Sequence, residues 1–445
     1  MELVIGCVGK PSAGKSTFFN AVTDGKAKVG NFPFTTIEPN EGITYYMTEC
    51  PCKARGKTSL CAPKYGQCVD GTRHIPVKLL DVAGLIPGAS EGAGLGNKFL
   101  DDLRHAHVLM HIVDVSGTTN EKGETTIGYN PLHDADWLTS EIHNWIYNNL
   151  WKRWPSIARR HGATQAALRT TFQQQLSGYG ASASTVVAVL NALGEMAKEP
   201  CNLTAWGEPQ VHALVDAFLA IRFPTILVLN KADVGAETDK NIANVAEKYG
   251  SDKCFVASAA SECFLRNLHA KGIIKYEVGD MFFSTHDDDA SLKVPEPKMA
   301  KRLEHVLDMV LFRHGSTGVR NAINAAVDLA NMIVVYPVKS LKNFTTTEGD
   351  VFGHAVLVKK GATVREIAHV VSATVAANFA YAEGEDGRRL PEDEPITSPT
   401  LIIKFTTHAS KEGSGPPPPP TDEKKPKKDK AKGASTDTAA EASLV

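Results

Sequence analysis

Features that would place a protein in a membrane, outside the cell or on nucleic acid are missing from this 445-residue sequence. No segment approaches the roughly 18–20 uninterrupted apolar residues that a membrane-spanning helix requires. The first apolar run, Leu3-Val4-Ile5, begins almost at once and leaves no room for a signal or transit peptide. The formal net charge is −2, so nucleic-acid binding would need a local cationic patch. We expect a cytoplasmic protein without membrane contact.

Apolar runs that each deliver a polar residue at their C-terminal end recur along the chain. They are Val4–Val8, Val77–Leu80 before Asp81, Val108–Val113 before Asp114, Thr225–Leu229 before Asn230, and Cys254–Ala257 before Ser258. Continuous apolar runs are typical of parallel strands that are buried on both faces. In such α/β sheets, ligands bind outside the carboxyl ends of the strands. The sequence therefore predicts a doubly wound, mostly parallel sheet with a ligand site at one edge.

The remaining segments predict further domains, because 445 residues are enough for two or three cores. We expect the α/β domain to comprise residues 1–128 and 221–296, with a helical insertion at 129–220 and a helical connector at 297–332. Strands at Ile333–Val338, His354–Lys359 and Leu401–Phe405 around a helix at Val364–Val375 predict a small α+β domain over 333–407. The Pro- and Lys-rich tail, 408–445, has a composition typical of disorder. It is either a solubilising tail or an electrostatic tether to RNA or another acidic partner.

The first loop after a strand has the pattern G-x-x-x-x-G-K-[ST]. Its residues are Gly9, Lys10, Pro11, Ser12, Ala13, Gly14, Lys15 and Ser16, and a helix opens at Thr17. Glycines let backbone N–H groups converge on phosphate oxygens, aided by the N-terminus of the helix. Lys15 is expected to reach the β- and γ-phosphates, and the Ser16 hydroxyl is expected to bind Mg²⁺. The loop predicts a nucleoside triphosphate site.

Guanine specificity is predicted by Asn230-Lys231-Ala232-Asp233, directly after the fourth apolar run. The Asp233 carboxylate can accept two hydrogen bonds from guanine, whereas adenine offers no such donor pair. Asn230 is expected to brace the loop, and the Lys231 stem to lie over the base. Ser258 and Ala259 follow the next run and would complete the base pocket through a backbone N–H.

Two further segments lie where the γ-phosphate and Mg²⁺ are expected. Asp81 of Asp81-Val82-Ala83-Gly84 would hold Mg²⁺ through a water, and the Gly84 N–H would meet the γ-phosphate; the alternative for Asp81 is a helix cap. The glycine-rich stretch that follows favours a segment ordered by the γ-phosphate and released on hydrolysis. Upstream, the threonines of Phe32–Thr36 are candidate Mg²⁺ ligands, unless that segment is an ordinary β-turn.

Together these motifs resemble the Obg-like translation-factor GTPases, most closely their YchF branch. The resemblance is carried by residues 9–20 (GKPSAGKSTFFN), 31–40 (NFPFTTIEPN), 81–99 (DVAGLIPGASEGAGLGNKF), 101–104 and 230–233, and it covers most of residues 1–407. It implies Mg²⁺ ligation by Ser16 and Thr36. It also implies that residues 333–407 are a TGS domain, a β-grasp module, and that the protein works with the ribosome or ribosomal RNA.

The sequence departs from its relatives at three positions that affect hydrolysis. Leu85 stands where Ras-like enzymes carry a glutamine that positions water, so we expect slow intrinsic hydrolysis and assign no catalytic residue. Ser12 replaces an asparagine that can coordinate potassium, so potassium dependence is not carried over. Ser90 replaces a histidine of some YchF relatives. Because Asp233 is kept, GTP is favoured over the ATP that some YchF relatives prefer.

Four of the eight cysteines cluster between the two expected switch segments. They are Cys50, Cys52, Cys61 and Cys68. Four thiolates can bind zinc, although this spacing is less regular than paired C-x-x-C knuckles. Zn²⁺, free thiols in an ordered loop, and a redox disulfide all remain open.

Three functions are therefore compared. The leading hypothesis is a GTPase that converts GTP to GDP and acts as a timed switch. The second is a nucleotide-gated RNA- or ribosome-binding protein whose hydrolysis is incidental, and the third is an ATPase.

Overall fold

The chain folds around two β-sheets. A computed structural model describes residues 2–23, 40–82, 99, 102–198, 200–235 and 237–408. The described residues up to Thr407 form one compact unit. The expectations for Thr36, Gly84, Leu85, Ser90 and nearly all of the tail lie outside the described residues.

The first sheet has seven strands in the order β2-β4-β1-β5-β6-β7, with β3 beside β4. Its strands are β1 (Val4–Val8), β2 (Glu41–Glu49), β3 (Gln67–Val69), β4 (Thr72–Asp81), β5 (Val108–Asp114), β6 (Thr225–Asn230) and β7 (Cys254–Val256). Pairing is parallel from β4 through β1, β5 and β6 to β7, and antiparallel where β2 and β3 meet β4. The predicted mostly parallel α/β fold is confirmed.

Helices cover both faces of this sheet because its strands are apolar on both sides. On β1, Ile5 and Cys7 pack with α1 (Lys15–Val22) and α13 (Val319–Leu329). Val8, on the opposite face, joins the core of the helices that follow β5. Helix α13 lies within the predicted connector, yet it packs into the core of the first sheet.

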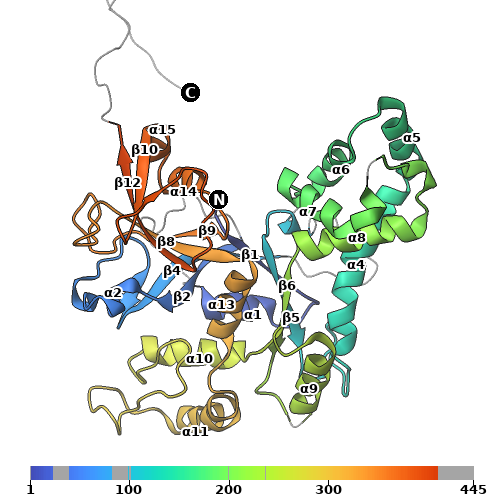
Figure 1. The fold of residues 1–445 in the computed structure, drawn as a ribbon. Helices are drawn as coiled ribbons and strands as arrows, with labels where there is room; N and C mark the ends of the chain where they lie inside the picture. The colour runs from blue at the N-terminus through green and yellow to red at the C-terminus, as the bar shows by residue number, and fades with distance from the viewer. Residues whose placement is uncertain are drawn as a thin grey trace, which may run out of the picture. The chain divides into compact units, whose positions relative to one another are not determined.

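The other helices form two groups. After β5 come α4 (Leu132–Trp151), α5 (Trp154–Thr164), α6 (Leu168–Leu176), α7 (Ala183–Leu193) and α8 (Glu208–Arg222), which lie together in green in Figure 1. After β6 come α9 (Thr238–Tyr249), α10 (Ala259–Ala270), α11 (Pro297–Val306) and α12 (Phe312–His314). Among the described residues no single helix is long and apolar enough to cross a membrane, although the pair 168–179 and 183–197, bent by 118°, passes that test together.

The second sheet has five strands in the order β11-β10-β12-β8-β9. They are β8 (Met332–Val338), β9 (Val356–Lys359), β10 (Phe379–Gly384), β11 (Arg389–Leu390) and β12 (Thr400–Thr407), with α14 (Val364–Val371) and α15 (Ala373–Ala377) between β9 and β10. The parallel pair β8–β12 lies at its centre. Strands β10 and β11 were not predicted.

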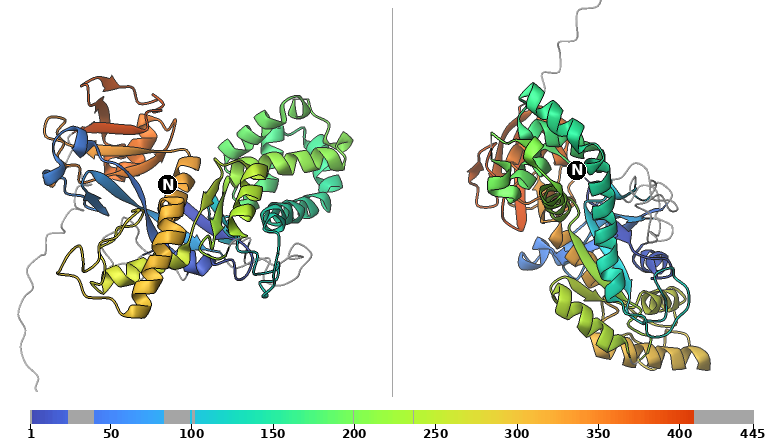
Figure 2. Two further views of the ribbon diagram at one scale, coloured as in Figure 1. Left: turned by 90° about the horizontal axis from the view of Figure 1, so that it is seen from below. Right: turned by 90° about the vertical axis from the view of Figure 1, so that its right-hand side faces the viewer.

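The segment between the expected switches is structured rather than a plain loop. Strand β2 pairs with β4 from Glu41↔Leu80 to Glu49↔Thr72. Beyond β2 come α2 (Pro51–Ala54), a 3₁₀ turn (Thr58–Leu60) and β3. The end of β2 and β4 that lies near Cys50 packs against the second sheet; in Figure 2 the two parts are drawn in blue and in orange to red.

Candidate functional site

The carboxyl ends of the parallel strands bring the predicted nucleotide residues to one edge of the first sheet. The loop 9–14 leaves β1, while Asp81, Asp114 and Asn230 are the last residues of β4, β5 and β6. The strand register places these residues at similar heights along neighbouring strands, because Cys7 pairs with Asp81 and Asp114 pairs with Asn230. The edge is therefore the ligand position that the sequence predicted for this kind of sheet.

Asn230 joins the phosphate loop to the two base motifs. Its side-chain amide donates to the Ala13 carbonyl at 3.0 Å, and its oxygen accepts from the Ala259 N–H at 3.1 Å. The amide lies so close to Gly14 that a Cβ there would be 2.4 Å from its nitrogen. Gly14 also has a φ of 93°, so glycine is required at this position on both grounds.

The Asp233 carboxylate is held in place by Ser258. The Ser258 hydroxyl donates to Asp233 Oδ1 at 2.7 Å, and the Ser258 N–H donates to the Thr317 carbonyl at 2.9 Å. Ser258 is fully buried, whereas Asp233 is half-buried. One oxygen of Asp233 is therefore fixed by the protein, and the carboxylate keeps acceptor capacity for a ligand.

Asp114 fixes the ammonium of Lys231, an interaction that was not predicted. Its Oδ2 accepts from Lys231 Nζ at 2.7 Å and from the Thr119 hydroxyl at 2.6 Å. Burial raises the pKa of Asp114, but hydrogen bonds and the Lys231 charge outweigh it and lower that pKa below its ordinary value. The signal was present in the sequence, because Asp114 ends a buried strand just as Asp81 does.

Hard oxygen ligands meet at the start of α1. The Ser16 hydroxyl donates to Asp81 Oδ2 at 3.0 Å. A hydroxyl beside a carboxylate is the donor set that Mg²⁺ prefers, so these residues fit the predicted ion. The neighbouring Lys15 ammonium donates to the Lys10 carbonyl at 2.8 Å. Burial lowers the pKa of Lys15, and the nearby Asp81 charge partly offsets this effect.

Lys10 connects the phosphate loop to the helices that follow β5. Its ammonium lies 2.7 Å from Asp134 of α4, donates to the Thr119 carbonyl at 2.7 Å and lies 4.2 Å from the centre of the Tyr129 ring. Lys10 and Asp134 are both buried. The loop and α4 are thus joined by an ion pair that water does not reach freely.

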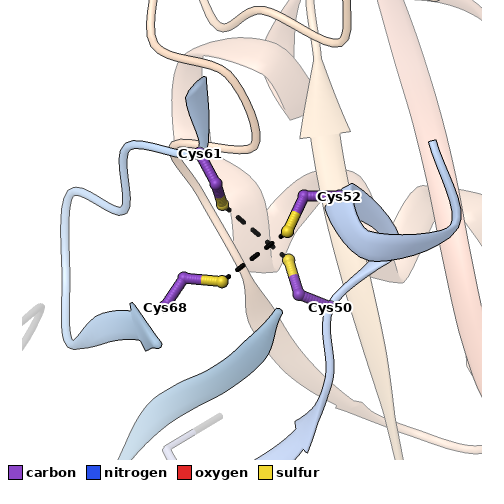
Figure 3. A group of neighbouring side chains, drawn as sticks. All are labelled: Cys50, Cys52, Cys61 and Cys68. Atoms are coloured by element: carbon purple, nitrogen blue, oxygen red, sulfur yellow. Dashed lines mark hydrogen bonds between the residues drawn. The ribbon is translucent and has the colours of Figure 1, made fainter. Parts of the chain in front are cut away.

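The four clustered cysteines converge at the opposite end of β4 (Figure 3). Their sulfur atoms all lie within 4.8 Å of one another. Cys50 and Cys61 are 3.9 Å apart, and Cys52 and Cys68 are 3.7 Å apart. All four are free thiols in this structure, because a disulfide would bring two sulfurs to about 2.0 Å.

Two family models and several known proteins match this chain. Residues 228–340 match the Obg-like GTPase YGR210-like, G4 motif-containing domain, and residues 4–142 match the 50S ribosome-binding GTPase family. A GTP-binding protein of Schizosaccharomyces pombe is 47% identical over 407 residues, which cover 91% of this chain and 98% of that protein. The crystal structure of a GTP-binding protein from Pyrococcus horikoshii is 31% identical, with a TM-score of 0.70 over 92% of this chain and 100% of that one.

A shorter match concerns a protein named for the ribosome. The ribosome-binding ATPase YchF of Buchnera aphidicola is 37% identical over 145 residues, which are 32% of this chain and 36% of that protein. The two long matches each cover more than nine-tenths of this chain. The chain therefore belongs to the Obg-like, YchF-type family of GTP-binding P-loop proteins.

Proposed function

We propose that this protein hydrolyses GTP to GDP and phosphate with Mg²⁺ and acts as a slow molecular switch linked to the ribosome. The observation that carries the proposal is Asn230, which joins the phosphate loop at Ala13 to Ala259 of the base motif. Because Asn230 connects the two loops, the free energy gained when the base binds can help to position the phosphates.

Guanine is the proposed base because Asp233 offers a carboxylate at the base position. A guanine would donate two hydrogen bonds to it, while adenine would leave the carboxylate unpaired. The hydrogen bond from Ser258 limits rotation of the carboxylate, so less orientational freedom is lost on binding.

Phosphate binding is assigned to residues 9–17. Lys15 would pair with β- and γ-phosphate oxygens, and backbone N–H groups of the loop would donate to the others. Ser16 and Thr36 would hold Mg²⁺ directly and Asp81 through a water, and the Gly84 N–H would meet the γ-phosphate. The ion supplies positive charge against the oxygens on which charge accumulates during transfer.

Slow turnover is proposed because no described side chain at this edge is an evident base for water, and Leu85 cannot orient one. Unassisted Ras, which has the glutamine, turns over at roughly 10⁻⁴ s⁻¹ and gains about 10⁵-fold with its partner. The ribosome is proposed as the partner here, given the 50S ribosome-binding family match over residues 4–142 and the YchF relative that is named a ribosome-binding ATPase. The second sheet, 333–407, is the proposed TGS-type docking module.

Calorimetric titration with GTP, GDP and ATP, repeated with purified ribosomes, tests the proposal. We expect GTP and GDP to bind at least tenfold more tightly than ATP, and ribosomes to raise the rate of phosphate release. Equal affinity for ATP would favour an ATPase, a candidate supported by the YchF relative that is named an ATPase. GTP binding with no release under any condition would favour the nucleotide-gated binding protein.

A further inference from the structure

The geometry of the four-cysteine cluster matches a metal site better than a set of unligated thiols. Zinc bound by four thiolates is tetrahedral with Zn–S distances of about 2.3 Å, which places the sulfurs roughly 3.8 Å apart. The sulfur atoms of Cys50 and Cys61 are 3.9 Å apart, and those of Cys52 and Cys68 are 3.7 Å apart. Figure 3 shows all four sulfurs pointing toward one central position. The ligands come from the end of β2, α2, the turn after Thr58–Leu60 and β3, so all four elements would be joined.

A buried arginine supplies an independent argument for negative charge at this place. Arg73 is 1% exposed, and its guanidinium donates to the Phe352 and Gly353 carbonyls at 2.8 Å and 3.1 Å. It also approaches Cys61 Sγ at 3.9 Å. In the part of the chain that the structure describes, no carboxylate pairs with it. A buried cation needs a counter-charge, and a zinc ion with four thiolates carries a net charge of −2.

The surroundings of the cluster are largely apolar, as in structural zinc sites. Cys50 and Cys52 are fully buried, and Cys61 and Cys68 are half-buried. The two buried cysteines share a core with Val334, Tyr336, Val338 and Ile402 of the second sheet and with Phe352 of the loop between β8 and β9. Four protein ligands leave no open position for water or substrate, which distinguishes structural from catalytic zinc. The site would therefore hold structure and perform no reaction.

The same segment carries the contacts that attach the second sheet. The Ala62 N–H donates to the Val351 carbonyl at 3.0 Å, and the Lys64 N–H donates to the Gly353 carbonyl at 2.8 Å. These backbone contacts lie between the third and fourth cysteines. Their geometry therefore depends on the conformation of residues 61–68, which has only short regular elements of its own.

We propose that Cys50, Cys52, Cys61 and Cys68 bind one Zn²⁺ ion. This ion fixes the conformation of residues 50–68, and through that segment it holds the second sheet against the paired strands β2 and β4. Nine residue pairs of β2 and β4 separate the cysteines from Asp81, which is about 30 Å along the strands. The cysteine site is therefore separate from the nucleotide site. The inference does not depend on GTP hydrolysis.

Metal content tests the site itself. The full chain, purified without chelators, is expected to hold about one zinc per chain by mass spectrometry, with no visible absorption from iron–sulfur groups. C50S and C61S are each expected to lose at least tenfold of this zinc, and C201S, outside the cluster, to keep it. If the full chain stays below about 0.1 equivalents after incubation with Zn²⁺, the cysteines are thiols or disulfides and the proposal is wrong.

Two measurements guard against variants that fail to fold. Wild-type protein reconstituted with Co²⁺ is expected to show the absorption of a tetrahedral thiolate site, and its absence would contradict four-cysteine ligation. Hydrogen exchange compares zinc-loaded with chelated wild type: exchange is expected to rise at least tenfold in 50–68 and in 351–353, and not in α1. Unchanged exchange in 351–353 would contradict the proposal that zinc holds the second sheet in place. GTP affinity, measured in parallel, reports on the nucleotide site independently.

Discussion

At the scale of single residues, recognition of guanine is expected to depend on the charge of Asp233. The substitution Asp233→Asn replaces an acceptor oxygen by a donor, while Ser258 still holds the remaining oxygen. One hydrogen bond from guanine would be replaced by two donors facing each other, and the other would no longer be made to a charged group. We therefore expect GTP affinity to fall by about 100-fold and xanthosine triphosphate to bind better than GTP. Competition binding measures both; Asp252→Asn, at an exposed aspartate, is the control. An unchanged preference for GTP would contradict the assignment.

Residues within motifs could be predicted from the sequence, and their partners from distant segments could not. The pattern around Gly14, Ser16, Asn230 and Asp233 has fixed spacing, since each motif sits at a strand end. The pairing of Lys10 with Asp134 involves positions 124 apart along the chain, and no local pattern marks it. Asp114 shows the intermediate case, because its position predicted an edge residue but not its partner Lys231.

At the scale of elements, the central strand β5 contains a histidine that makes stability depend on pH. His111 is 1% exposed, and burial, with a smaller effect of Lys15, lowers its pKa to about 3. Between pH 6.5 and that value, the unfolded chain binds more protons than the folded one, so the free energy of unfolding falls as pH falls. We expect His111 to account for a loss of about 3 kcal/mol between pH 7 and pH 4.

Chemical denaturation at several pH values measures this loss in wild type and in His111→Gln. The difference between the two slopes isolates the histidine from the other titrating groups. We expect the variant to be less stable at pH 7 but flatter with pH. Parallel slopes would mean that folding does not lower the pKa of His111.

The strands that are buried on both faces were predicted, and each missed strand is short or has an exposed face. β1, β5 and β6 are continuous apolar runs, which the sequence displays directly. β2, with the sequence EGITYYMTE, has few fully buried residues and lies at the edge of its sheet, so it shows no such run. β10 and β11 are similarly half-exposed or short. Of the four missed strands, β2 and β3 are the two that flank or carry the clustered cysteines.

At the scale of the whole molecule, the ion pair of Lys10 with Asp134 joins the phosphate loop to α4. Lys10→Met would leave a buried carboxylate without its counter-charge, which costs about 3 kcal/mol of stability. The double variant Lys10→Met/Asp134→Leu is expected to recover part of this loss. Denaturation midpoints measure both variants, and Lys198→Met, which breaks an exposed pair, is the control. A double variant no more stable than the single one would argue against an electrostatic cause.

The second sheet is expected to be needed for the stability of the first. A chain that ends at Leu329 would expose Ile75 and Cys52 and would leave Arg73 without its two carbonyl acceptors. We expect this truncation to lower the midpoint of thermal unfolding by more than 10 °C or to make the chain insoluble, since several core contacts are lost together. Glu348→Gln breaks only the exposed pair with Lys64 and should leave the midpoint of thermal unfolding nearly unchanged. A fully stable truncated chain would contradict the shared core.

The pairing of nine residues between β2 and β4 restricts the insertions and deletions that β2 can tolerate. Glu41 is paired beside the end of β4 at the nucleotide edge, and Glu49 is followed at once by Cys50. Side chains alternate between faces, so inserting or deleting one residue within β2 would turn every later side chain to the opposite face. It would also shift Cys50 by about 3.3 Å along the sheet. Natural relatives with both the phosphate loop and the cysteines should therefore keep this interval constant, while the intervals between the cysteines vary.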